Sequence, residues 1–71
     1  MKMRNIAKEV GQLIRSQRKA RNISQEALAA KSKIDRSYMG RIERGEVNVT
    51  LKALWDIAAS MEISVKLLIP D

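Results

Sequence analysis

The chain has 71 residues, a net charge of +6 and 45% apolar residues, enough for a folded core and too many for a disordered tail. It contains no Cys and no His, which excludes disulfides, thiolate or imidazole metal ligands and the commonest general base. No apolar run reaches membrane-spanning length, and no apolar signal segment follows the basic start. We therefore expect one cytoplasmic domain over residues 1–71, with its core at about 6–69, and no cofactor, metal or membrane partner.

The positive charge is concentrated in the first two thirds of the chain. Residues 1–21 carry seven Lys or Arg and one Glu, residues 22–45 carry five against three acidic residues, and residues 46–71 carry two against four. A basic region of this kind favours a polyanion as partner. A solubilising surface would give the same composition, so charge alone does not decide between the two interpretations.

The spacing of apolar residues predicts helices along the whole chain. Between residues 6 and 21 apolar side chains recur at helical spacing after Asn5, a predicted N-cap. Beyond this helix one pattern occurs four times: an apolar residue precedes a capping residue, and another apolar residue follows four positions after the cap. This pattern is the hydrophobic staple of a helix N-terminus. The four instances are Ile23-Ser24 with Leu28, Ile34-Asp35 with Met39, Val49-Thr50 with Leu54, and Ile63-Ser64 with Leu68.

The signals for helix ends agree with these starts. Asn22 and Gly45 lie where a helix ends in left-handed geometry, and Pro70 closes the last helix. Gly11, inside the first helix, is interpreted as a close-packing point. The predicted helices are 6–21, 24–31, 35–44, 50–61 and 64–69, and no segment alternates as a strand does. The predicted fold class is therefore all-α, a compact domain of five helices.

The second and third predicted helices are joined by a connection of the length found in a helix-turn-helix. With its apolar residues facing the core, the third helix would turn Arg36, Ser37, Gly40, Arg41 and Arg44 outward. Long donors near the start of such a helix can reach base edges, and a small residue lets the backbone approach the groove. A solvated basic face is the alternative, but the helix-turn-helix frame favours DNA recognition.

A set of residues along the chain matches one known pattern: Gly11, Arg18, Ser24-Gln25-Glu26, Leu28-Ala29, Ile34, Tyr38-Met39, Ile42-Glu43, Gly45, Thr50, Leu54 and Ile57-Ala58. Over about residues 6–68 the chain resembles the helix-turn-helix family of phage repressors, Cro proteins and xenobiotic-response-element-type regulators. The stretches 35–38, 42–45 and 48–50 most resemble the controller proteins of restriction–modification systems, which are short dimers of this domain alone. The resemblance implies a five-helix lambda-repressor-like domain and a bacterial repressor or activator that binds double-stranded DNA.

The resemblance also implies roles for individual residues. Arg36, Ser37, Tyr38 and Arg41 fall where the family reads base edges. Ser24, Gln25, Arg44, Asn48 and Thr50 fall where it contacts the phosphate backbone. Arg18 and Glu43 match a structural ion pair between the first and third helices. Lys33 occupies a turn position where the family often has Gly, so we expect a positive φ there.

A homodimer on a palindromic operator follows from the same resemblance. On the fourth predicted helix the core stripe is Leu51, Leu54, Ile57, Ala58 and Met61, with Trp55 at its edge. Trp55 either covers the core of one subunit or joins two subunits. We place the dimer interface at Trp55, Leu67 and Ile69, because so short a fifth helix cannot easily bury all of this apolar surface. The expected partners are double-stranded DNA, a second copy of the chain and RNA polymerase.

Three other functions compete with this interpretation. The antitoxin of a toxin–antitoxin pair can use this domain, but antitoxins usually need a toxin-binding extension, and only residues 1–5 and 71 lie outside the domain here. A cationic amphipathic peptide on membranes or RNA is disfavoured because stapled helices indicate a packed globule. An enzyme is disfavoured because no nucleophile–base pair, Gly-rich phosphate loop or metal cluster is evident.

Overall fold

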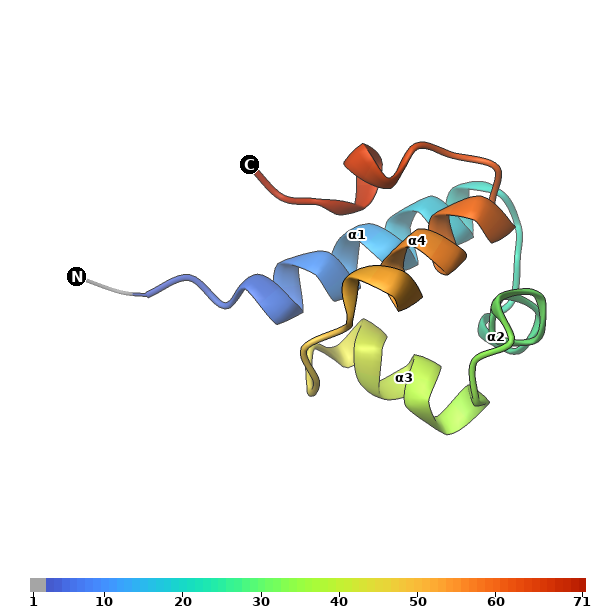
Figure 1. Cartoon of the computed structure of the whole chain (residues 1–71), viewed down its shortest axis with the longest axis horizontal. Coiled ribbons are helices and arrows are strands. Elements are labelled where there is room, and N and C mark those ends of the chain that lie inside the picture. Colours follow the sequence, from blue (N-terminus) through green and yellow to red (C-terminus); the bar gives the residue numbers. More distant parts are fainter. Residues whose placement is uncertain (1–2) are drawn as a thin grey trace.

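The computed structural model describes residues 3–71, which form four α-helices and one short 3₁₀ helix (Figure 1). The elements are α1 (Ile6–Ala20), α2 (Gln25–Ser32), α3 (Arg36–Arg44), α4 (Leu51–Ser60) and the 3₁₀ helix η1 (Val65–Leu68). Helix α1 packs on α3, α2 packs on both α3 and α4, and η1 packs on α1 and α4. Residues 3–71 contain no strand, so the prediction of an all-helical domain is confirmed. None of the helices in this range has both the length and the apolar character needed to cross a bilayer.

The fifth predicted helix differs from the prediction in kind. Over 64–69 the structure has η1, a 3₁₀ helix of four residues, which is too short to form successive i→i+4 hydrogen bonds. Ile69 after it is extended, and Pro70 has no backbone N–H with which a helix could continue. The described chain therefore has four α-helices rather than five.

The predicted helix starts are confirmed by their hydrogen bonds. The four α-helix caps accept hydrogen bonds of 3.0–3.2 Å from backbone amides three residues later, and they are Asn5, Ser24, Asp35 and Thr50. Ser64 caps η1 by accepting a hydrogen bond of 3.2 Å from the amide of Lys66. The second apolar residue of every staple is buried, and these residues are Leu28, Met39, Leu54 and Leu68. Local sequence therefore locates each start, because cap and staple are both short-range contacts.

The four α-helices all end in left-handed geometry. The positive-φ residues are Asn22, Lys33, Gly45 and Glu62, with φ between 54° and 75°. The predictions for the first three are confirmed, and Glu62 was missed because Glu carries no such signal. After each of them the next amide bonds to a carbonyl five residues back, as in a Schellman motif. These bonds run from Ile23 to Arg18, Ile34 to Ala29, Glu46 to Arg41 and Ile63 to Ala58, at 2.9–3.1 Å.

Three isoleucines serve two helices at once. Ile23, Ile34 and Ile63 each close the Schellman turn of one helix through the backbone. Each is also the apolar residue before the next cap, and its side chain is partly buried against the core. In the three connections that contain these isoleucines, almost every residue therefore belongs either to the end of one helix or to the start of the next.

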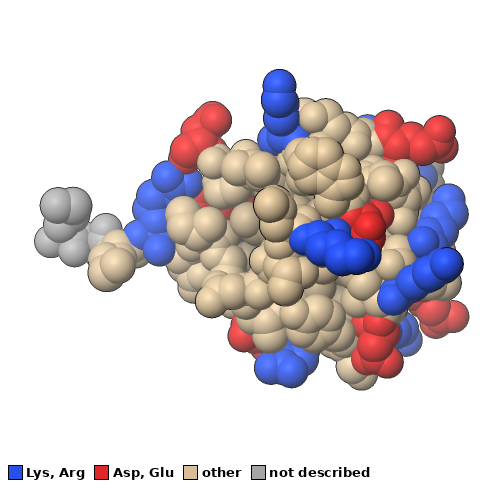
Figure 2. Space-filling model, viewed as in Figure 1, with Lys and Arg blue, Asp and Glu red and all other residues tan. Residues whose placement is uncertain are grey.

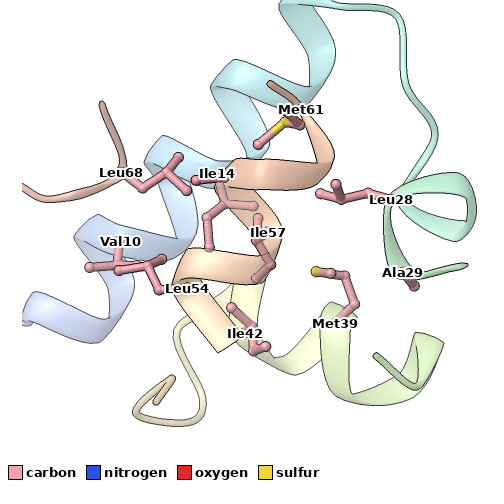
Figure 3. Close-up of a cluster of buried hydrophobic side chains, with 11 residues drawn as sticks. Val10, Ile14, Leu28, Ala29, Met39, Ile42, Leu54, Ile57, Met61 and Leu68 are labelled. Atoms are coloured by element: carbon pink, nitrogen blue, oxygen red, sulfur yellow. The ribbon is translucent and has the colours of Figure 1, made fainter. Parts of the chain in front are cut away.

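Eleven buried apolar residues from all five elements meet in one core (Figure 3). They are Val10, Ile14, Leu28, Ala29, Met39, Ile42, Leu54, Ile57, Ala58, Met61 and Leu68. The prediction that Leu51 belongs to this core is wrong, because its side chain is 68% exposed. Helical Cα–Cβ bonds tilt toward the N-terminus, so the first side chain of α4 projects beyond the helix end.

Helix α1 crosses α3 at backbone contact distance. A Cβ atom added to Gly11 would lie 2.5 Å from the carbonyl oxygens of both Ile42 and Glu43. This confirms that Gly11 is a close-packing point. The crossing holds the last turn of α3 against α1 and so determines where its exposed face lies.

Candidate nucleic-acid interface

Helix α3 has one buried face and one exposed cationic face. Met39 and Ile42 are at most 1% exposed and lie in the core. The side chains on the opposite face, Arg36, Ser37, Arg41 and Arg44, are all exposed. A short helix that is anchored by one face and presents long donors on the other has the form of a recognition helix.

The structure brings five of the predicted contact residues together in one open hollow on α2 and α3. They are Gln25, Arg36, Ser37, Arg41 and Arg44, with Gly40 between them. As expected, Gly40 faces this hollow, although it is itself buried. A Cβ there would lie 3.1 Å from Nη1 of Arg44 and 3.4 Å from Oε1 of Gln25. Gly40 therefore makes room for these two side chains, which lie over it.

The arginines of α3 are paired with carboxylates. Arg36 Nη1 lies 3.6 Å from Glu26 Oε2. Arg44 Nε donates to Glu46 Oε2 at 2.6 Å, and Arg41 Nε lies 3.9 Å from Glu46 Oε1. The hydrogen bonds from Arg44 lower the pKa of Glu46 below its ordinary value. Neither glutamate was singled out from the sequence, although Glu46 follows Arg44 by only two residues.

Tyr38, Ser24 and Thr50 do not line this hollow. Tyr38 is partly buried against the core, unlike its neighbours Arg36 and Ser37. The hydroxyls of Ser24 and Thr50 accept cap hydrogen bonds, and a hydroxyl that accepts in this way can still donate its O–H to a phosphate.

Two further predicted phosphate contacts belong to the connection after α3. Asn48 is exposed between α3 and α4. Thr50, at the end of that connection, lines a separate groove between α2 and α4 together with Lys33 and Lys52. The structure therefore does not bring Thr50 into the hollow that holds the arginines.

Arg18 and Glu43 form a buried ion pair with two parallel hydrogen bonds. Arg18 Nε donates to Glu43 Oε2 at 2.8 Å and Nη2 donates to Oε1 at 2.9 Å. Arg18 Nη1 donates to the carbonyl of Ile23 at 3.0 Å, and Gln25 Nε2 donates to Glu43 Oε1 at 3.2 Å. The exposed fractions of the two paired side chains are 10% and 3%. This network joins α1, α2 and α3, and all three nitrogens of the Arg18 guanidinium donate within the protein.

Sequence reasoning missed a group of polar residues on α1. Lys8, Gln12 and Arg15 line a polar pit with Gln25 and Arg44, next to the hollow on α3. The signal was their spacing, since residues three and four apart share one face of a helix. These side chains extend the cationic surface from α3 onto α1.

The predicted dimer residues are exposed but lie in two places. Trp55 is 59% exposed and borders a hollow with Ile63 and Val65. Leu67 and Ile69 are 47% and 48% exposed and border a different hollow against α1. Figure 2 shows a largely uncharged face, with a basic and an acidic side chain next to each other near its middle and further charged side chains toward its edges.

Comparison with known proteins places this geometry in a family. A helix-turn-helix family model (HTH_3) matches residues 14–68. The control protein C.SmaI of Serratia marcescens is 46% identical over 52 residues, which are 73% of this chain and 62% of that protein. The chain therefore spans less than two thirds of C.SmaI. The control protein C.MunI of a Mycoplasma species is 36% identical over 70 residues, which are 97% of this chain and 95% of that protein.

A solved structure agrees with the sequence matches. The restriction–modification controller protein C.AhdI from Aeromonas hydrophila superposes with a TM-score of 0.86 and 40% identity, covering 89% of this chain and 96% of that one. The fold, the exposed face of α3 and the sequence matches lead to one assignment. The chain belongs to the helix-turn-helix family HTH_3 and resembles its restriction–modification controller proteins in both sequence and fold.

Proposed function

We propose that this protein is a transcriptional regulator that binds a specific double-stranded DNA sequence, as a controller of the restriction–modification type. The observation that carries the proposal is the exposed row of Arg36, Ser37 and Arg41 on α3, whose opposite face is anchored in the core. The names of the control proteins C.SmaI and C.MunI support the regulatory role.

The proposed mechanism divides the interface between specificity and affinity. Arg36 and Arg41 enter the major groove, where an arginine fork can bond to O6 and N7 of guanine. Ser37 adds a shorter donor and acceptor, and Tyr38 lies beside it as a further base contact. The phosphate backbone is bound by Ser24, Gln25, Arg44, Asn48 and Thr50. We add Lys8 and Arg15 to this set, because they line the polar pit that Gln25 and Arg44 share.

The regulator acts as a homodimer in this proposal. Two recognition helices related by a two-fold axis would read half-sites of a palindrome about one DNA turn, roughly 34 Å, apart. The exposed Trp55, Leu67 and Ile69 supply the apolar surface for such an axis. RNA polymerase stays an expected partner of the regulator, without residues assigned to it.

The binding mode is tested by titration of labelled duplex DNA at several salt concentrations. With about 4–8 phosphate contacts per dimer, log affinity should fall against log salt with a slope of about −4 to −7. Selection from randomised duplexes should yield one palindromic sequence. Equal affinity for duplex, single-stranded DNA and anionic vesicles would contradict the proposal, since charge alone would then explain the binding.

A further inference from the structure

Each of the three arginines on α3 lies within ion-pair distance of a carboxylate, and Glu46 serves two of them. Its Oε2 accepts a hydrogen bond of 2.6 Å from Arg44 Nε, and its Oε1 lies 3.4 Å from Arg44 Nη2 and 3.9 Å from Arg41 Nε. A carboxylate on a surface built to meet phosphates repels DNA. Glu46 therefore does not serve to attract DNA, and its position beside two arginines indicates another role.

Glu46 is held by backbone that cannot easily move. Gly45 before it is left-handed, with φ of 75°, and the Glu46 amide donates to the Arg41 carbonyl at 2.9 Å. Arg41 and Arg44 therefore contact the carboxylate of a residue whose main chain forms part of the end of α3. Hydrogen bonding by Arg44 keeps the pKa of Glu46 low, so Glu46 is ionised at neutral pH.

The contact geometry affects the two arginines differently. Arg41 approaches Glu46 through Nε, which leaves both Nη atoms of its fork for a guanine edge. Arg44 uses both Nε and Nη2 on the carboxylate, which leaves mainly Nη1 for a phosphate. Glu46 can therefore orient Arg41 while it competes with phosphate for Arg44.

We propose that Glu46 determines how strongly the protein prefers its operator over other DNA, by positioning Arg41 and by restraining Arg44. This inference rests on the proposed function. Non-specific binding is almost entirely attraction between cations and phosphates, so it is weakened by a carboxylate that occupies Arg44. Operator binding loses the same attraction between Arg44 and phosphate. It is favoured, however, by an Arg41 guanidinium that Glu46 has already oriented toward the bases in this proposal.

The test compares Glu46→Gln with the charge-matched control Glu62→Gln. Both changes raise the net charge by one. Glu46 lies in the connection between α3 and the N-terminal end of α4, whereas Glu62 follows the C-terminal end of α4 (Figure 1). The probes are a duplex of arbitrary sequence and the operator duplex that the wild type selects from a random pool. For Glu46→Gln we expect affinity for the arbitrary duplex to rise about three- to tenfold, with a salt slope steeper by about 0.9 per protomer.

The ratio of the two affinities decides the inference. It should fall about two- to fivefold in Glu46→Gln, the range expected for one exposed ion pair, and stay at the wild-type value in Glu62→Gln. Thermal unfolding should show an unchanged midpoint for both variants. If both variants keep the wild-type ratio, or change it equally, Glu46 does not set selectivity. If the wild type selects no sequence at all, the proposed function itself fails.

Discussion

Arg18 differs from the other arginines in that its guanidinium is buried and all three of its nitrogens donate within the protein. Truncation of one partner of a buried ion pair leaves an uncompensated charge, at a cost of about 3–5 kcal/mol. Arg18→Ala should therefore lower the thermal unfolding midpoint by more than about 10 °C, measured by circular dichroism. The exposed Arg15 on the same helix gives the control, because Arg15→Ala should move the midpoint little.

The outcome of Arg18→Ala also separates two roles for this side chain. Loss of DNA binding through unfolding fits the structural ion pair. A variant that keeps the wild-type midpoint and still loses DNA binding would show that Arg18 contacts a phosphate, contrary to the prediction.

Arg36 and Arg44 are both exposed on α3, but they should affect DNA binding differently. A bidentate contact between arginine and guanine discriminates against a wrong base by about 1–3 kcal/mol. Arg36→Ala should relax the preference at one base pair of each half-site in a random-site selection. Arg44→Ala should weaken all duplexes alike and flatten the salt slope. The assignment fails if Arg44→Ala alters the selected sequence and Arg36→Ala leaves it unchanged.

At the scale of elements, the crossing of α1 and α3 depends on Gly11. A Cβ at this position would overlap two carbonyl oxygens of α3, which belong to backbone and cannot rotate away. Gly11→Ala should therefore destabilise the protein by about 1–3 kcal/mol in denaturant unfolding, although alanine favours helices more than glycine does. Ser16→Ala on the exposed face of α1 is the control and should be neutral or slightly stabilising. A Gly11→Ala variant more stable than the wild type would show that the two helices can separate without loss.

At the scale of the whole molecule, we predict that the oligomeric state depends on Trp55. This side chain is 59% exposed in the single chain, an unusual exposure for a large aromatic residue unless a partner covers it. Sedimentation at tens of micromolar should show a dimer for the wild type and a monomer for Trp55→Ala. The neighbouring variant Lys52→Ala should remain dimeric, since it removes no apolar surface. A wild type that stays monomeric and binds one half-site without cooperativity would contradict the dimer.

Much of this fold could be predicted from the sequence because it depends on short-range contacts. Caps such as Ser24 and Asp35 bond amides three residues away, and staple partners such as Ile34 and Met39 are five residues apart, so a local pattern reveals them. The 3₁₀ form of η1 could not be predicted in this way, since a cap and a staple precede it as they do an α-helix. Leu51 was placed wrongly because periodicity does not show where a helix extends beyond its neighbours.

The candidate site was predictable only in part. The arginines of α3 were found because helical spacing separates the exposed face of a helix from its buried face. The pair of Arg18 and Glu43 joins residues 25 positions apart, and only the family resemblance suggested it. The burial of Gly40 and the two contacts of Glu46 depend on which way long side chains fold across the surface. No periodicity in the sequence carries that information.

The three shared isoleucines limit where this chain can change in length. An insertion beside Ile23, Ile34 or Ile63 would move either the closing amide or the staple side chain out of register, so one helix end would be lost. The connection between α3 and α4 differs, because Glu46 closes one helix and Val49 precedes the cap of the next. Val47 and Asn48 lie between them, outside both motifs. Residues gained or lost among natural relatives should therefore accumulate at this connection, beside the proposed DNA-binding surface, where a longer loop could bring new contacts while the end of α3 and the cap of α4 stay in register, provided that Val47 keeps its place against the core.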